Sequence, residues 1–247
     1  MTQSAGHIQV RVRNVSKTYR RGSESLHVLD CLSVDIVEGQ FLGLMGPSGS
    51  GKTTLLNLIA GLDSPDGDDA DGTGSNEVSI EVAGAEISRM SESELASWRT
   101  RNIGFIFQFY HLLPVLSAFD NVELPLLLLP MTKAQRRQQV LTALQIVGLE
   151  DRMDHRPGQL SGGQQQRVGI ARAIVTDPAV IVADEPTGDL DAKSASEILD
   201  LLVELKSSLK KTILMVTHDP RAAARTDSIL FLDKGRLVEE MPAFASK

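Results

Sequence analysis

The chain has 247 residues, of which 42% are hydrophobic and 23% charged, and it carries a formal net charge of −7. This length suits one large domain or two small ones, and the composition is that of a globular protein with a buried core. The acidic balance argues against a broad nucleic-acid-binding surface, though not against a local basic patch. The single cysteine, Cys31, cannot form an internal disulfide, which fits a reducing compartment. We predict that Cys31 is a small buried residue beside Leu32.

Membrane-targeting segments are not expected. Residues 1–10 lack a basic stretch followed by an apolar run, so they do not resemble a signal peptide. The most apolar segment, 124–131, is too short to cross a bilayer and is broken by Pro125 and Pro130. We therefore expect a cytoplasmic protein, in which any membrane role comes through a partner.

The first third of the chain predicts strands that lead into a helix. Residues 8–15 and 32–37 alternate apolar and polar side chains, as half-buried strands do, and a buried strand follows at 40–46. After Lys52 the pattern becomes that of a helix, which Gly61 closes. The glycine-rich stretch GPSGSGKTT therefore lies between a strand and a helix.

Residues 63–76 are rich in Asp, Gly and Ser, and they predict a loop with nothing to bury. A calcium-binding loop is the alternative. When Gly72 is aligned with the invariant glycine of an EF-hand, Gly67 falls at the first ligand position and Val78 at the position of the bidentate glutamate. Neither residue has a side-chain oxygen to bind calcium, so we predict a flexible acidic loop, whose role the sequence does not reveal.

The rest of the chain predicts an alternation of strands and helices. A capping box at 91–94 opens a short helix, and the segment 118–175 is mainly helical. We predict strands at 77–84, 103–107, 179–184 and 211–217, a helix at 193–209, and a hairpin at 228–240 that turns at 234–235. This order predicts one α/β domain over 1–247, with a helical insert between about 90 and 175.

Positions 46–53 fit the pattern G-x-x-x-x-G-K-[ST], which is typical of a loop that cradles phosphate groups. Glycines let backbone N–H groups approach an anion, and the start of the following helix adds partial positive charge. Lys52 would reach the β- and γ-phosphates, and the Thr53 hydroxyl would ligate Mg²⁺. An ordinary glycine-rich turn is the alternative, but the predicted strand and helix around the loop favour a nucleoside triphosphate site.

The segment VIVADEP at 180–186 places two carboxylates at the end of a predicted buried strand. Asp184 suits Mg²⁺, usually through water. Glu185 is placed to orient or deprotonate an attacking water. An acidic turn that starts at Pro186 is the alternative, and the phosphate loop makes it the weaker one.

The segment LSGGQQQRV at 160–168 resembles the signature motif of ATP-binding-cassette (ABC) ATPases. This resemblance implies an α/β P-loop NTPase fold of the ABC ATPase type, with a RecA-like core, an antiparallel β subdomain and a helical subdomain. It also implies that the signature of one copy faces the ATP of a second copy, so that two chains enclose two nucleotides in a C2 dimer. An ordinary serine N-cap is the alternative, which explains Ser161 but not Gly162 and Gly163.

Further positions match the family one by one. Tyr19 takes the place of the aromatic residue that stacks on adenine, and Gln108 that of the glutamine that touches Mg²⁺ and the attacking water. Asp191 matches the aspartate that crosses the dimer interface, and His218 the histidine that contacts the γ-phosphate. The alternatives are a surface tyrosine, a strand-ending glutamine, a helix N-cap and an isolated histidine.

The resemblance thus implies ATP and Mg²⁺ as ligands. The implied catalytic residues are Glu185, His218, Gln108 and Lys52. The implied metal ligands are Thr53, Gln108 and Asp184. The implied nucleotide-binding residues are Tyr19, Gly46, Pro47, Ser48, Gly49, Ser50, Gly51, Lys52, Thr53, Thr54, Ser161, Gly162, Gly163, Gln164 and Asp191.

The stretch FIFQFYHLLPVLSAFDNVELPLLL at 105–128 resembles the branch of the family that contains the lipoprotein-release ATPase LolD, the macrolide-export protein MacB and the division ATPase FtsE. Its apolar residues would suit docking of a partner's coupling helix, or they pack inside the helical insert. The resemblance implies an ATPase subunit on the inner face of the cell membrane that works with a second copy of itself and a separate permease, with no nucleic-acid partner.

Two other functions are weighed against this one. A soluble regulatory or nucleic-acid-linked ABC ATPase would use ATP as a timer, but the chain has one cassette and no long insertion. A catalytically inactive binding module is disfavoured by the intact Lys52, Asp184, Glu185 and His218.

Overall fold

The computed structural model describes residues 7–22, 24–66 and 77–238. Its strands are β1 (Ile8–Arg21), β2 (Glu24–Val37), β3 (Phe41–Met45), β4 (Ser79–Val82), β5 (Ala85–Glu86), β6 (Ile103–Phe107), β7 (Val180–Asp184), β8 (Thr212–Val216), β9 (Ser228–Asp233) and β10 (Arg236–Val238). Its α-helices are α1 (Lys52–Ile59), α2 (Glu92–Asn102), α3 (Ala118–Glu123), α4 (Lys133–Ile146), α5 (Gly162–Ile174), α6 (Ala192–Leu209) and α7 (Pro220–Ala223). Short 3₁₀ helices are η1 (Leu124–Leu128), η2 (Glu150–Arg152) and η3 (Pro157–Gln159).

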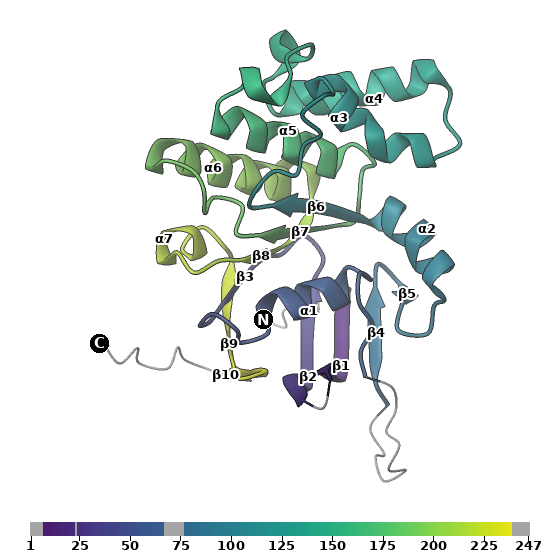
Figure 1. Cartoon of the computed structure of the whole chain (residues 1–247), viewed down its shortest axis with the longest axis vertical. Coiled ribbons are helices and arrows are strands. Elements are labelled where there is room, and N and C mark those ends of the chain that lie inside the picture. Colours follow the sequence, from purple (N-terminus) through teal and green to yellow (C-terminus); the bar gives the residue numbers. More distant parts are fainter. Residues whose placement is uncertain (1–6, 23, 67–76, 239–247) are drawn as a thin grey trace, which may run out of the picture.

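Two β-sheets form the frame of the described residues (Figure 1). The four-stranded sheet has the order β2-β1-β4-β5, and its strands pair antiparallel. The six-stranded sheet has the order β10-β9-β3-β8-β7-β6, in which all neighbours are parallel except β10 and β9. Parallel pairing brings the carboxyl ends of β3, β7 and β8 to one edge, where ligands bind in open α/β sheets.

The central strands of the six-stranded sheet are buried on both faces. In β8, Ile213 and Met215 join a cluster with α3 to α6, whereas Leu214 and Val216 join a cluster with α1 and the antiparallel sheet. Side chains alternate across a strand, so a strand that is covered on both faces needs an unbroken apolar run. This is why the central strands could be predicted as continuous hydrophobic segments.

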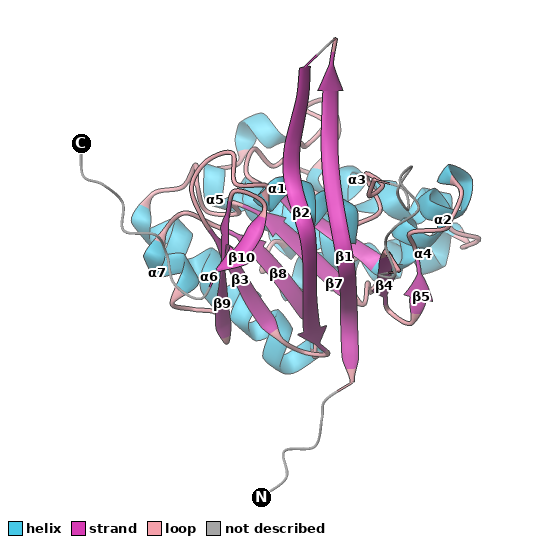
Figure 2. Cartoon of the chain, turned by 90° about the horizontal axis from the view of Figure 1, so that it is seen from below, coloured by secondary structure: helices cyan, strands magenta, loops and turns pink. Residues whose placement is uncertain are grey.

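The β1–β2 hairpin is longer than the strands predicted at 8–15 and 32–37, and Figure 2 shows it extending past the six-stranded sheet. Cys31 in this hairpin is exposed and has a φ of 46°, so the prediction that it is buried was wrong. The strand pairing shifts register between Val15, opposite Leu32, and Lys17, opposite Leu29. The irregularity turns Cys31 outward, while Leu29 and Leu32 stay buried on either side of it.

The segment predicted as a helical insert contains a strand of the six-stranded sheet as well as helices. β6 lies within it and pairs with β7, so this part of the segment belongs to the six-stranded sheet. α2 precedes β6, and the capping box predicted at its start is confirmed by Ser91 and Glu94. The helices α3, α4 and α5 pack on one another beyond the sheet (Figure 1). Residues 67–76 of the predicted acidic loop lie outside the described residues.

No helix among residues 7–22, 24–66 and 77–238 combines the length and the apolar character that crossing a bilayer requires.

Candidate active site

The glycine-rich stretch forms the loop between β3 and α1. α1 begins after Gly51, which has a φ of 104°, and no side chain among the described residues caps this helix start. Gly46 has a φ of 151°, and a Cβ there would lie 2.1 Å from the carbonyl oxygen of Leu232. Glycine is therefore required at both positions. Because no side chain occupies the first N–H groups of α1, they are left for an anion.

Lys52 folds back onto this loop. Its Nζ donates to the carbonyl oxygens of Gly46 and Pro47, at 2.9 Å each. Lys52 is only 8% exposed, and burial lowers its pKa, although the nearby Glu185 and Asp184 act in the opposite direction. Charged phosphate oxygens are stronger partners for an ammonium group than neutral carbonyls. The loop thus holds the lysine at the place where a phosphate would take over its hydrogen bonds.

Ser50 is a further polar residue of the loop. Its Oγ is buried and has no hydrogen-bond partner among the described residues, while its backbone is held by Pro47 and Gly235. A buried hydroxyl without a partner is costly, so it is commonly satisfied by water or a ligand.

Asp184 lies beside the start of α1. The Oγ1 of Thr53 donates to its Oδ2 at 3.2 Å. Burial raises the pKa of Asp184 and Glu185 adds to that increase, whereas Thr53 and Lys52 lower it. A carboxylate and a hydroxyl are hard oxygen donors of the kind that Mg²⁺ prefers. The Thr53–Asp184 pair therefore fits a magnesium ion at the phosphate loop.

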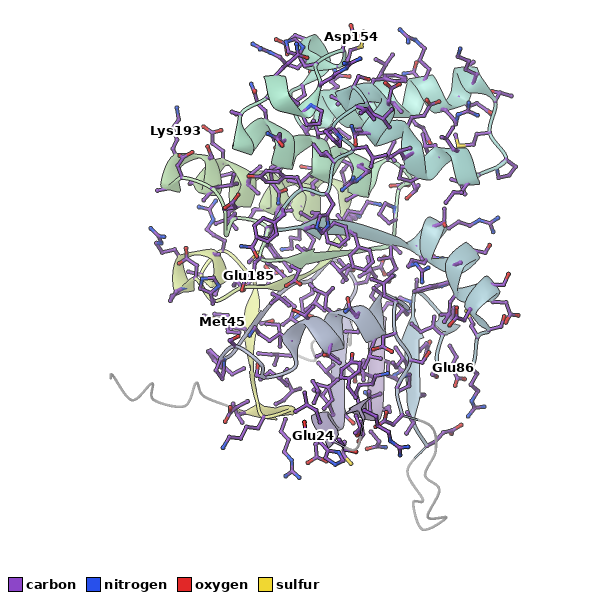
Figure 3. The ribbon with its side chains drawn as sticks, viewed as in Figure 1. Glu24, Met45, Glu86, Asp154, Glu185 and Lys193 are labelled. Carbon is purple, nitrogen blue, oxygen red and sulfur yellow. The ribbon has the colours of Figure 1, made fainter. Side chains whose placement is uncertain are left out.

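Glu185 and His218 form a pair at the same edge of the sheet. Glu185 follows β7 and has a φ of 46°, a left-handed conformation that its N–H bond to the carbonyl of Val216, 2.9 Å, helps to hold. Its Oε1 lies 2.8 Å from Nδ1 of His218, which follows β8. Figure 3 shows the labelled Glu185 at the same end of the sheet as Met45, the last residue before the phosphate loop. A carboxylate and an imidazole in contact can hold or move a proton.

Four of the residues described above line a cavity of about 620 Å³: Lys52, Thr53, Glu185 and His218. Its lining consists of Tyr19, Leu26, Val28, Gly46, Ser48, Gly49, Gly51, Lys52, Thr53, Thr54, Glu185, Val216 and His218. A lining that combines phosphate-loop groups with apolar and aromatic side chains suits a nucleotide.

Leu26 and Val28 are cavity residues that sequence reasoning missed. Both lie on β2, and Leu26 is the cross-strand partner of Tyr19 on β1. This register was the signal that could have found them. It was not readable because the strands extend well past the alternating segments from which they were predicted.

The remaining predicted site residues do not line this cavity. Ser161 is the exposed N-cap of α5 and forms a capping box with Gln164. Asp191 caps α6 through the N–H groups of Lys193 and Ser194. The predicted residues absent from the cavity lining of this single chain are Pro47, Ser50, Gln108, Ser161, Gly162, Gly163, Gln164, Asp184 and Asp191.

Gln108 and Gln166 do not line the cavity. The Nε2 of Gln108 is so close to Gly188 that a Cβ there would lie 2.9 Å from it. Gln166, which sequence reasoning also missed, is fully buried on α5 and donates to the carbonyls of Phe107, at 3.2 Å, and Pro186, at 2.6 Å. It thus joins α5 to the residues that precede Gln108 and follow Glu185. Its glutamine-rich surroundings in LSGGQQQRV gave no signal of which glutamine points inward.

The model of the family described as "ABC transporter" matches residues 29–188. The chain belongs to the ABC transporter family. Its fold is that of an ABC ATPase cassette, as the signature motif predicted, and the chain is an ABC-type ATPase.

Individual relatives of this ABC cassette agree with the predicted branch. The lipoprotein-releasing system ATP-binding protein LolD of Chromohalobacter salexigens is 42% identical over 94% of each chain. The macrolide export ATP-binding/permease protein MacB 1/2 of Paracoccus denitrificans is 44% identical over 94% of this chain but only 33% of its own length. The cassette MJ0796 of Methanocaldococcus jannaschii, solved as a dimer in a post-hydrolysis state with ADP and Pi, is 39% identical, with a TM-score of 0.81 over 95% of this chain and 100% of its own.

Proposed function

We propose that this ABC cassette binds ATP with Mg²⁺, pairs with a second copy to hydrolyse it, and drives a separate membrane permease of the lipoprotein-release or macrolide-export type. The observation that carries the proposal is the Glu185–His218 pair, 2.8 Å apart, on the rim of the cavity that the phosphate loop lines. A nucleotide-binding module without hydrolysis would not need a carboxylate at that point.

The phosphate loop supplies the grip on the nucleotide. Lys52 would bind the β- and γ-phosphates in place of the loop carbonyls, and the uncapped N–H groups of α1 would bind the remaining oxygens. Tyr19 would stack on the base. Thr53, Asp184 and Gln108 would hold Mg²⁺, which would neutralise charge that develops on the phosphate oxygens.

Glu185 would act as the general base. It would accept a proton from the water that attacks the γ-phosphorus, while the water oxygen forms a bond to phosphorus and the bond to ADP breaks. His218 contacts one carboxylate oxygen of Glu185 and lines the same cavity. It would orient the base there and would contact the γ-phosphate of a bound nucleotide. The strained backbone at Glu185 helps to fix this geometry.

The signature residues point to a second copy. Ser161 is exposed, and neither it nor Gly162, Gly163, Gln164 or Asp191 lines the cavity of its own chain. A helix N-terminus that begins with two small residues suits an anion, so in a head-to-tail pair it would cover the γ-phosphate held by the other copy. The dimeric state of the MJ0796 cassette supports this arrangement.

The surface after β6 supports a membrane partner. Phe109 is 61% exposed, Leu113 47% and Val115 72%, so this segment presents apolar side chains next to Gln108. Exposed apolar patches of this kind mark protein contacts, and a coupling helix of a permease is the partner that the branch of the family suggests. We place the cassette in the cytoplasm, on the inner face of the membrane, with the whole chain 1–247 acting as one ABC ATPase domain whose helical subdomain lies within about 90–175.

Purification in mild detergent tests the proposal. The tagged chain should hydrolyse ATP and should co-purify from the membrane fraction with an integral membrane protein. RNA or ribosomes in its place would favour the soluble regulatory alternative. Absence of ATP hydrolysis both alone and with its membrane partner would favour the inactive binding module.

A further inference from the structure

Tyr19 is held beside the cavity by a shared carboxylate. Its hydroxyl donates to Oδ2 of Asp63 at 2.6 Å, and the Nζ of Lys17 donates to Oδ1 of the same residue, also at 2.6 Å. The Lys17 ammonium lies 5.1 Å from the centroid of the Tyr19 ring. Lys17 and Tyr19 both come from β1, whereas Asp63 follows α1 at the start of the acidic segment. The carboxylate therefore ties the aromatic residue to the helix that the phosphate loop opens.

Asp63 is itself well anchored. Its Oδ1 accepts from the N–H of Ser64 at 2.8 Å, and Lys17 also donates to the Ser64 carbonyl at 2.6 Å. The N–H of Asp66 donates to the carbonyl of Ser16 at 2.9 Å, which joins the same segment to β1 a second time. The side chains of Lys17 and Asp63 are only 12% and 27% exposed, so water screens this pair less than an ordinary surface pair. Although burial raises the pKa of Asp63, its hydrogen bonds hold that pKa below the ordinary value, which keeps the carboxylate charged.

Tyr19 needs such support because its side chain is exposed. It is 39% exposed near the end of a long hairpin (Figure 2), and its cross-strand neighbour Leu26 is 65% exposed. An exposed aromatic side chain loses rotamer freedom when it stacks on a ligand, and this loss weakens binding unless the rotamer is already fixed. The bonds to Asp63 fix it in the absence of nucleotide.

We propose that Asp63 and Lys17 are positioning residues that hold the Tyr19 ring ready to stack on the base of the nucleotide. Lys17 lies over one face of the ring, which leaves the opposite face for the base. The inference rests on the proposed function, because it requires ATP in the cavity. It assigns a role to the first residue of the acidic segment, for which the sequence suggested none.

A double-mutant cycle with two probes tests the inference. The variants are Asp63→Ala, Tyr19→Phe, which keeps the ring but removes the hydroxyl, and the two combined. Asp35→Ala is the matched control, since Asp35 pairs with Arg13 in the same antiparallel sheet but does not line the cavity. Lys17→Met tests the same positioning role by removing the cation that pairs with Asp63. Affinity is measured by calorimetry for ATP and by displacement of ATP for inorganic tripolyphosphate, which has no base.

We expect each single variant to bind ATP at least about threefold more weakly, a part of the effect that stacking on an aromatic ring can supply. The double variant should lose no more ATP affinity than the weaker-binding of its two single variants, because Asp63→Ala and Tyr19→Phe remove the same hydrogen bond. Tripolyphosphate should bind all variants and the Asp35→Ala control like the wild type.

Several outcomes would overturn the inference. Unchanged ATP affinity in both Asp63→Ala and Lys17→Met would remove the positioning role while leaving ATP binding intact. Equal weakening for ATP and tripolyphosphate would show that Asp63 supports the phosphate loop rather than Tyr19. Additive losses in the double variant would show that the two residues act independently. A wild-type chain that bound neither probe would instead refute the proposed function.

Discussion

The helices α1 and α5 both have glycines at their start, and they begin differently. α1 starts after Gly51 in a left-handed conformation, with no capping side chain among the described residues. α5 starts after Ser161, whose side chain accepts the N–H of Gln164 while the Gln164 side chain returns to the N–H of Ser161. The first helix start faces a cavity of about 620 Å³, whereas the second is exposed and lines no part of it.

The difference separates a complete half-site from an incomplete one. Around α1, Lys52, Thr53 and Asp184 already contact one another or the loop, so this half can bind a nucleotide within one chain. In the α5 half, the first turn of the helix is satisfied by its own capping box and lines no part of the cavity. Nucleotide binding should therefore be a property of the monomer, and hydrolysis a property of the pair.

The largest effect is expected on the hydrolysis step, which we assign to the pair of chains and not to the monomer. Glu185→Gln removes the proposed general base, and hydrolysis should fall about 10²- to 10⁴-fold, the usual contribution of such a group. ATP binding should persist, so that the ATP-bound dimer accumulates in size-exclusion chromatography. The control is Glu197→Gln on α6, which changes a carboxylate that pairs with Arg167 of α5. Hydrolysis at the normal rate in Glu185→Gln would contradict the assignment of the base.

Lys52→Ala tests whether the α1 half binds nucleotide by itself. Removal of a buried charged partner should weaken ATP affinity about 30-fold or more. Calorimetry on the monomeric protein measures this directly, with Lys133→Ala on the exposed face of α4 as the control. Unchanged affinity would mean that the phosphate loop does not hold the triphosphate.

Ser161→Arg tests the α5 half. A large side chain forced into a close contact costs of the order of 1–3 kcal/mol, so dimerisation with ATP should weaken about tenfold or more. ATP binding by the monomer should stay within about twofold, because Ser161 does not line the cavity. The dimer fraction is read by analytical ultracentrifugation in the Glu185→Gln background, with Ser208→Arg as the control. Loss of ATP binding together with dimerisation would instead point to misfolding.

Gln166→Leu tests the link between the two halves. It removes hydrogen bonds from α5 to the carbonyls of Phe107 and Pro186, and we expect kcat to fall about fivefold, the scale of one net hydrogen bond. The affinity for ATP should change little, since the phosphate loop is untouched. Steady-state kinetics separates the two quantities, and Gln138→Leu on α4 is the control. A loss confined to ATP affinity would remove Gln166 from this linking role.

Local patterns were enough for the chemistry of the phosphate loop. Gly46, Gly51 and Lys52 are specified by their spacing, and the alternation of strand and helix around them is specified by hydrophobic periodicity. The carboxylates of Asp184, at the end of β7, and of Glu185, directly after it, were predicted from the same kind of pattern. The family was likewise evident in LSGGQQQRV, since glycines after a serine cap are not needed for capping alone.

Contacts between distant segments could not be predicted in this way. Cys31 turned outward because a shift of strand register interrupted the alternation on which its predicted burial depended. Leu26 entered the cavity wall because it pairs with Tyr19 across the hairpin, and Asp63 reached Tyr19 from the far end of α1. Tyr19 and Asp63 are 44 positions apart in the sequence, so no local window contains both partners of that contact.

The sequence by itself thus determined which side chains grip phosphate and which carboxylates stand at the strand end, because these depend on spacing within a few residues. The tertiary structure decided which side chains meet: the contact of Glu185 with His218, the hold of Asp63 on Tyr19, and the separation of Ser161 from the cavity of its own chain. Each of these depends on the order and register of strands that pair across long stretches of the chain.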